Sequence, residues 1–339
     1  MPQPIICLDE EVRQLAERFR SVFTKPQYQY FVTVLLGLME CDGKRTLSGV
    51  LSKVGQPPSL SGLSRFFAEA PWLQEALVDI WLEHFRAEMQ PLVEAEREQQ
   101  RTLQPKGRGR PKQPLVTGYV IGDDSTMSKP KGRKMQGLGK HHSTTYDQRI
   151  IGHSLVQGLS VLLDRRCPLA PQLYRQAPVC EAENVTFHSK IELMETLIRE
   201  FEPVAGTQTH ILLDSWYCAK CLWHAARERD FLITTGLKSN RWLRVPDETT
   251  AQGWRWQKLS DYLASLTEQD FVQTSWPRGG KKVYVHVITT GVRKLYRCQI
   301  VIVRHSLDAP LSQARYFASS DLDATTEALL AHISARLRH

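Results

Sequence analysis

The sequence predicts an α/β protein with a helical N-terminal domain, and three observations lead to this fold class. In residues 1–103, apolar side chains recur at helical spacing with no strand-like alternation. A polar, basic stretch rich in glycine and proline follows at 104–117. From residue 118 onward, short apolar runs typical of strands alternate with helical segments, which favours a sheet with helices packed on it.

Residues 1–103 are expected to form a small helical domain. Apolar spacing indicates helices between Val12 and Phe23, over Phe31–Met39, and over Leu73–Phe85. We expect Pro91 to kink or end the third helix, because proline has no amide hydrogen to donate. The pattern leaves two alternatives open for this domain, a DNA-binding helix-turn-helix or generic helix packing.

The segment 104–117 is predicted to be a basic linker. Its Arg-Gly-Arg-Pro core resembles an AT-hook, an extended segment whose arginines enter the minor groove of A·T-rich DNA. Arg108, Arg110 and Lys112 are therefore candidate DNA-binding residues. A plain basic linker is the alternative.

Residues 118–239 are predicted to hold the first part of the core. A capping box of Ser189 and Glu192 begins one helix, and a second helix over 219–228 lies between two strands, which indicates a βαβ unit with parallel strands. The expected strands are Tyr119–Ile121, Arg149–Gln157, Leu159–Leu163, Ile211–Leu213 and Phe231–Thr235.

The C-terminal third divides into two predicted parts. Residues 240–312 are strand-rich and irregular, with the clearest strands at 283–289 and 296–303. Residues 313–339 read as a strand that returns to the core, followed by a final helix from Thr325 that carries Leu329, Ile333 and Leu337 on one face.

Positive charge is concentrated in the middle of the chain. The net charge is +8, and residues 101–140 contain ten Lys or Arg and two Asp, so the rest of the chain sums to zero. Such concentration is typical of a protein that binds a polyanion. No apolar stretch is long enough to span a bilayer and no signal-type segment begins the chain, so a cytosolic protein without membrane partners is expected.

The seven scattered cysteines do not indicate a disulfide framework. Cys218 and Cys221 form a CxxC pair, but a zinc site would normally need a second pair, which the sequence lacks. The simplest interpretation is two thiols on a helix.

Two carboxylates follow apolar strands at positions suited to metal binding. Asp124 and Asp214 each come after a predicted strand, and carboxylates at neighbouring strand ends can share Mg²⁺ or Mn²⁺ ions. Two such ions support phosphodiester chemistry. Aspartate is also a common turn residue, so either position alone would be more simply structural. Asp123 is the alternative to Asp124, because adjacent side chains on a strand point to opposite faces and only one can face the metals.

Three blocks of the sequence resemble the DDE transposases of bacterial insertion sequences. Residues 123–126 (DDST), with Lys129, Lys131 and the glycines that follow, resemble the first-aspartate block; residues 211–217 (ILLDSWY) resemble the second; and residues 237–241 (LKSNR) are similar to the segment that commonly comes next. In that family the aspartate directly before Ser or Thr is the catalytic one, which favours Asp124 over Asp123.

The resemblance implies an RNase H-like catalytic core with a β-rich insertion at 240–312, a two-ion Mg²⁺ or Mn²⁺ site, and a homodimer on double-stranded DNA at transposon ends and target, in a nucleoid-associated protein. In relatives an aromatic residue of the insertion holds a flipped base, and Trp242, Trp254, Trp256 and Trp276 are candidates by position, although core packing is the simpler role for each. The expected DNA-contacting residues beyond the linker are Lys129, Lys131, Arg133, Lys134, Lys140, Lys238 and Arg241.

The family's third acid lies on a helix after the insertion, and here that helix reaches His339 without it. We therefore expect a transposase cut short a few residues before its final Glu, weakly active or inactive alone. Glu327 is the only carboxylate on the final helix, in a first turn where an acid simply suits the helix dipole. The alternatives are a non-catalytic, transposase-derived DNA-binding protein and a nuclease relative unconnected with transposition.

Overall fold

The computed structural model describes residues 9–43, 45–103, 113–133, 135–143 and 147–336. The chain divides into two compact units, Met1–Ala87 and Glu88–His339. This division falls inside a helix and upstream of the expected domain boundary at 103. The linker residues Arg108, Arg110 and Lys112, together with Lys134, lie outside the described residues.

The first unit is helical, as the sequence predicted. Side chains that favour N-caps begin its helices: Asp9, Thr46 and Ser59 each accept a hydrogen bond from a backbone amide of the first turn. Phe23 and Phe66 lie in an aromatic core beneath these helices. The helices are α1 Glu10–Arg18, α2 Lys25–Met39, α3 Leu47–Leu51, α4 Leu60–Ala68 and the start of α5 Gln74–Leu103, with a 3-10 turn at Arg20–Val22.

Helix α5 corrects one expectation. It runs without a break from Gln74 to Leu103, so Pro91 does not end it. Near its C-terminal end, the Arg97 guanidinium donates to the Pro114 carbonyl at 2.8 Å and to the Gln113 side chain at 2.8 Å, which ties the helix to the segment just before the first strand. Within the described chain, no helix combines the length and apolar character that a membrane span needs.

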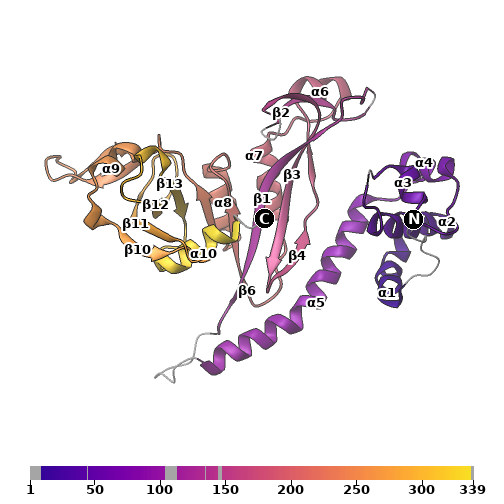
Figure 1. Ribbon diagram of the computed structural model, residues 1–339, viewed down its shortest axis with the longest axis horizontal. Helices are drawn as coiled ribbons and strands as arrows, with labels where there is room; N and C mark the ends of the chain where they lie inside the picture. The colour runs from indigo at the N-terminus through magenta and orange to yellow at the C-terminus, as the bar shows by residue number, and fades with distance from the viewer. Residues whose placement is uncertain (1–8, 44, 104–112, 134, 144–146, 337–339) are drawn as a thin grey trace. The chain divides into compact units, whose positions relative to one another are not determined.

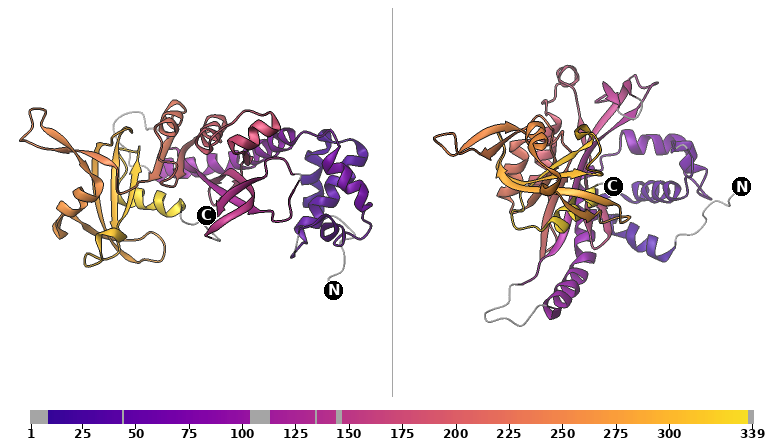
Figure 2. Two further views of the ribbon diagram at one scale, coloured as in Figure 1. Left: turned by 90° about the horizontal axis from the view of Figure 1, so that it is seen from above. Right: turned by 60° about the vertical axis from the view of Figure 1, so that its left-hand side comes forward.

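The second unit is built on a large mixed sheet. Its strands follow the order β10-β11-β12-β13-β7-β6-β1-β3-β2, with β4 and β5 also paired to β3 (Figures 1 and 2). β1 pairs parallel to β6 and β6 parallel to β7, and the other pairs are antiparallel. The core strands are β1 Val116–Ser128, β2 Gly139–Ser143, β3 Gln148–Leu162, β4 Arg165–Pro168, β5 Gln172–Tyr174, β6 Thr207–Leu213 and β7 Leu232–Gly236.

Strand β3 is one continuous strand where the sequence suggested two. Gly158, between the two expected segments, stays in the strand because the sheet is crowded there: a Cβ at this position would lie 2.9 Å from side-chain carbons of both Leu169 and Leu197. Glycine is used for this close approach and does not mark a turn. β1 is also longer than expected, so Asp123 and Asp124 lie within it and not at its end.

The parallel part of the sheet is the predicted βαβ unit. β6 leads through α8 Lys220–Glu228 to β7, and α7 Lys190–Glu200 precedes β6 with the expected capping box of Ser189 and Glu192. Met194 of α7 lies against Gly122 and Leu213 of the sheet. A short helix, α6 Ala177–Glu183, comes before α7.

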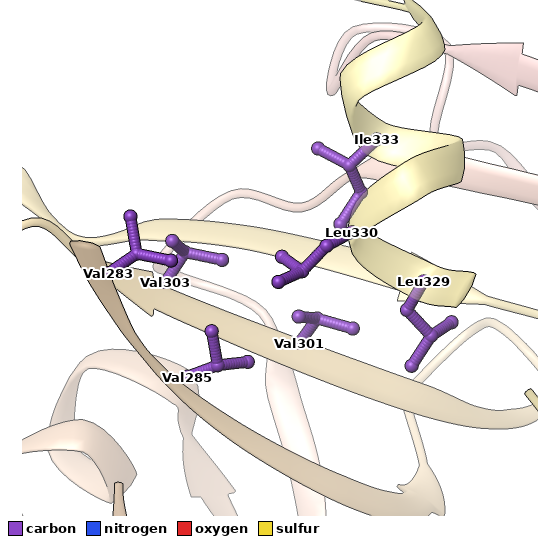
Figure 3. Close-up of a cluster of buried hydrophobic side chains, with 7 residues drawn as sticks. All are labelled: Val283, Val285, Val301, Val303, Leu329, Leu330 and Ile333. Carbon is purple, nitrogen blue, oxygen red and sulfur yellow. The ribbon is translucent and has the colours of Figure 1, made fainter. Parts of the chain in front are cut away.

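In the strand-rich C-terminal segment, β10 to β13 join the same sheet, whereas β8 and β9 form a separate two-stranded sheet. β11 and β12 extend it through β13, which pairs with β7. Residues of α10 cover these strands: Leu329, Leu330 and Ile333 pack on valines of β11 and β12 (Figure 3). The remaining elements are β8 Trp242–Pro246, β9 Trp254–Lys258, α9 Leu259–Ser265, β10 Val272–Ser275, β11 Lys282–Gly291, β12 Arg297–Arg304, β13 Arg315–Ser319 and α10 Thr326–Arg336, with 3-10 turns at Glu268–Asp270 and Leu311–Gln313.

Candidate active site

The two adjacent aspartates of β1 face opposite sides of the sheet. Ile121 packs with Ala335 of α10, and because side chains alternate along a strand, Asp123 shares that face. A Cβ on Gly122 would lie 2.6 Å from Met194 of α7, so the next even-numbered residue, Asp124, shares the α7 face. The α10 face and the α7 face of β1 therefore each carry one carboxylate.

On the α7 face, Asp124 is held by side chains of the protein. Lys190 Nζ donates to Asp124 Oδ2 at 2.5 Å, and the Tyr217 hydroxyl donates to Oδ1 at 3.2 Å. The Lys190 ammonium also lies 5.4 Å from the ring centroid of Tyr174. Burial, reinforced by the Asp124 charge, raises the pKa of Tyr217 far above its ordinary value, so its hydroxyl stays a donor. Both oxygens of Asp124 are thus engaged in an internal ion pair and hydrogen bond.

On the α10 face, Asp123 is more exposed and less fully paired. Its side chain is 58% exposed, and its nearest cation is Arg336, with 3.6 Å between the guanidinium Nη2 and Oδ2. Oδ1 accepts the amide hydrogen of Asp124 at 2.8 Å. Burial raises the pKa of Asp123, and the Asp214 charge adds to this, while the Asp124 amide and Arg336 lower it. The net shift is upward, so the surroundings do not fully compensate the ionised form.

Asp214 lies next to Asp123 at the carboxyl end of β6. The parallel register pairs Ile121 of β1 with Leu212 of β6, and both side chains pack with Ala335. Two residues further along each chain, the same register places Asp123 opposite Asp214. Asp214 Oδ1 accepts the amide hydrogens of Trp216 at 2.8 Å and Tyr217 at 3.1 Å, which fixes the turn after the strand. The register therefore sets the two carboxylates opposite one another where β6 ends and β1 continues.

The register of β1 and β6, continued two residues past its last pair, places Asp214 opposite Asp123, whereas the sequence favoured Asp124 as the partner of Asp214. Sequence reasoning identified the opposite orientations of the pair but could not assign a face to either. It also missed the partners Lys190, Tyr217 and Arg336. Only Tyr217 carried a signal, because it belongs to the sequence block that contains Asp214.

A third acidic ligand is not present in the part of the chain that the structure describes. No group of three His, Cys, Asp or Glu side chains suited to one metal ion occurs among those residues. Glu327 is exposed in the first turn of α10 and precedes Arg336 by nine residues, which is about 13 Å along a helix. Since Arg336 is the α10 residue that reaches Asp123, Glu327 is not positioned to join it.

Of the expected DNA-contacting residues, Lys131 and Arg133 lie on the loop after β1, and Lys140 lies in β2. All three are exposed. The part of the loop next to β2 is anchored by three contacts: Glu183 accepts the amide hydrogen of Gly137 at 2.5 Å and pairs with the Arg175 guanidinium at 2.9 Å, and the Gln136 carbonyl lies 2.9 Å from His153 Nε2.

The remaining expected residues have varied surroundings. Lys129 is half-buried, and Lys238 is exposed. Arg241 donates to the Cys218 carbonyl at 2.5 Å, which gives this guanidinium a structural role.

The four candidate tryptophans also differ. Trp276 is half-buried and packs against the cluster under α10. Trp242 is half-buried, with the Lys258 ammonium 5.7 Å from its ring centroid. Trp254 lies 4.3 Å below the guanidinium of Arg244 and edge-on to Trp256, whose side chain is 37% exposed. Among them, Trp256 is the most accessible to a base.

The CxxC cysteines behave as structural thiols. Cys218 is buried and Cys221 is half-buried, and both are free. Burial raises the pKa of each thiol above its ordinary value, which disfavours the thiolate that metal binding or redox chemistry requires.

A mixed sheet that carries two neighbouring carboxylates, in a chain that also exposes a group of basic side chains, is an arrangement typical of enzymes acting on nucleic-acid phosphodiesters. The comparison with protein families agrees: the model of the DDE superfamily endonucleases matches residues 18–262. The chain therefore belongs to the DDE superfamily of endonucleases, an enzymatic family whose substrate is DNA. A search of curated proteins found no match.

Proposed function

We propose that this protein is an insertion-sequence transposase, with an RNase H-like core that cleaves DNA and transfers strands at transposon ends. What carries the proposal is the β1–β6 register, which, continued past Ile121 and Leu212, sets Asp123 opposite Asp214 in a chain of the DDE superfamily. The exposed basic side chains of Lys131, Arg133 and Lys140 support it because phosphate contacts position DNA on such enzymes.

We assign the first catalytic carboxylate to Asp123, the alternative left open by the sequence. Asp124 is engaged by Lys190 and Tyr217, whereas Asp123 shares its face with Asp214 and the final helix. The upward shift in the pKa of Asp123, to which Asp214 contributes, supports the same assignment: two like charges side by side favour a bound cation.

The residues present fit a divalent metal in part. Carboxylate oxygens suit Mg²⁺ or Mn²⁺, and Asp123 and Asp214 would hold it. When bound, the two-ion site expected for the family would activate a water or 3′-hydroxyl and stabilise the leaving oxygen. Of the protein's own groups, the backbone amides of Trp216 and Tyr217 fix the Asp214 carboxylate, and the exposed basic side chains neutralise the DNA backbone.

We further propose that this chain alone cleaves weakly or not at all, because the described residues supply two acids and no third near them. This observation also supports the second candidate function, a transposase-derived protein that binds DNA without cutting it. Transposition requires two ends held together, so a homodimer on DNA is part of the first proposal.

A cleavage assay tests the function. DNA carrying transposon ends is incubated with Mg²⁺ or Mn²⁺ and this chain or its Asp123→Asn and Asp214→Asn variants. We expect at most weak cleavage by this chain and its complete loss in both variants. If no form cuts but all bind the ends, the non-catalytic function is correct.

A further inference from the structure

Arg336 is a mostly buried cation whose hydrogen bonding is incomplete. Its side chain is 22% exposed, and its Nη2 approaches Asp123 Oδ2 at 3.6 Å, which is longer than a good charge-assisted hydrogen bond. Its Nε is buried and makes no hydrogen bond to the described residues. A guanidinium normally binds a carboxylate through two short parallel hydrogen bonds, so this contact is weak for its type.

The position of Arg336 is set by the packing of α10. Leu329, Leu330 and Ile333 fix the helix on β11 and β12 (Figure 3), and Ala335 packs on Ile121 and Leu212. Arg336, the residue directly after Ala335, is thereby brought to Asp123, which follows Ile121 on the same face of β1. The guanidinium lies there because the fold positions it, and not because the ion pair is strong.

Next to the ion pair is space into which the side chain can move. Asp123 and Arg336 both line a cavity of about 520 Å³, whose wall also includes Gln157, Gly158 and Pro171. A water molecule occupies about 30 Å³ in the liquid, so the cavity can hold a displaced guanidinium together with hydrating water.

The two carboxylates, Asp123 and Asp214, are only partly neutralised by the side chains around them. Arg336 brings one positive charge at 3.6 Å, whereas a divalent cation would bring two at about 2.1 Å from the oxygens. Such a cation therefore interacts more strongly with Asp123 and Asp214 than the guanidinium does. A cation bound at Asp123 would also repel the guanidinium, which favours the movement of Arg336 away from Oδ2.

We infer that Arg336 is a built-in counter-ion, which occupies the place of a divalent cation beside Asp123 and moves into the adjoining cavity when the cation binds. The inference rests on the proposed function only in taking Asp123 as a metal ligand. It makes Arg336 a positioning residue that keeps the two carboxylates in place without metal and competes with metal for them.

The test is Mn²⁺ binding to the full chain, measured by electron paramagnetic resonance. Arg336→Gln is compared with the wild type, with Arg199→Gln as the matched control, since Arg199 of α7 pairs with Glu195 of the same helix and Glu228 of α8. Removing the competing charge is expected to tighten Mn²⁺ binding about five- to tenfold, and Arg199→Gln is expected to leave it unchanged. Saturating Mn²⁺ should also raise the melting temperature more for Arg336→Gln than for the wild type.

A second measurement uses the unmodified chain and does not depend on the folding of a variant. Nuclear magnetic resonance of the arginine Nε–H groups should show the Arg336 signal shifting on addition of Mg²⁺. Equal or weaker Mn²⁺ binding by Arg336→Gln, or an unmoved Arg336 signal, overturns the inference; if Asp123→Asn still abolishes Mn²⁺ binding, the proposed function survives. Absence of specific Mn²⁺ binding in every form overturns both.

Discussion

The ion pair between Lys190 and Asp124 provides a quantitative test of the structural role given to Asp124. The pair joins α7 to the centre of β1, and its side chains are 20% and 25% exposed. Removing one partner of a fully buried pair costs about 3–5 kcal/mol, because the other charge is left unpaired in the interior. A fully exposed pair contributes about 0–1 kcal/mol. With both side chains about three-quarters or more buried, we expect Lys190→Met to lower the free energy of unfolding by about 2–3 kcal/mol.

The double-mutant cycle separates the pair from other contacts of the lysine. In an Asp124→Asn background Lys190 is the charge left unpaired, so Lys190→Met removes that charge and should cost little or nothing, even with the contact with Tyr174 lost. The expected coupling is therefore at least about 2 kcal/mol. Urea unfolding followed by circular dichroism measures all four forms.

Arg199→Met is the matched control on the same helix, because Arg199 pairs with Glu195 and Glu228 at a more exposed position. It should cost less than about 1 kcal/mol. If the effects of Lys190→Met and Asp124→Asn add within about 0.5 kcal/mol, the pair is not coupled in solution and the structural role of Asp124 is refuted.

Three further predictions concern stability. Asp123→Asn should leave the metal-free chain at least as stable as the wild type at pH 7. Burial and the Asp214 charge hold the carboxyl pKa of Asp123 above its ordinary value, and the neutral amide removes the free-energy cost of ionising this group. A lower urea midpoint would contradict this. The rings of His210 and His332 are tilted against each other with their centroids 4.1 Å apart, and burial lowers the pKa of both. Stability should therefore fall as pH drops below about 6.5, the unfolded value, and a flat profile between pH 7.5 and 5.5 would count against the pair. Asp164→Gly, at φ 63° in the turn after β3, should raise the free energy of unfolding by about 0.5–1 kcal/mol in urea, and a loss would show that the aspartate is not strained there.

Much of the fold followed from local pattern. The capping box at Ser189 and the alternation of strand and helix from Ile211 to Thr235 predicted α7 and the parallel unit, because those signals lie in short segments. The continuity of β3 through Gly158 could not be predicted, since it depends on Leu169 and Leu197, which approach the strand only in the folded sheet.

The residue types of the candidate site could be predicted from the sequence, but the face of the sheet on which each aspartate lies could not. The spacing identified Asp214 and the Asp123–Asp124 pair, and strand alternation required that the pair diverge. The parallel register and the helices on each face determine which aspartate lies opposite Asp214. Neither can be predicted from the local sequence. Lys190 and Arg336 come from distant segments, so their contacts follow only from the tertiary fold.

The central claim is that Asp123 and Asp214, and not Asp124, hold the divalent cation of this DDE superfamily chain. It is tested most directly by titrating Mn²⁺ into the wild type and the Asp123→Asn, Asp124→Asn and Asp214→Asn variants, with calorimetry as the readout. The account predicts that Asp123→Asn and Asp214→Asn each weaken binding at least about tenfold, while Asp124→Asn stays within about threefold of the wild type. Loss of binding in Asp124→Asn with binding retained in Asp123→Asn would contradict it.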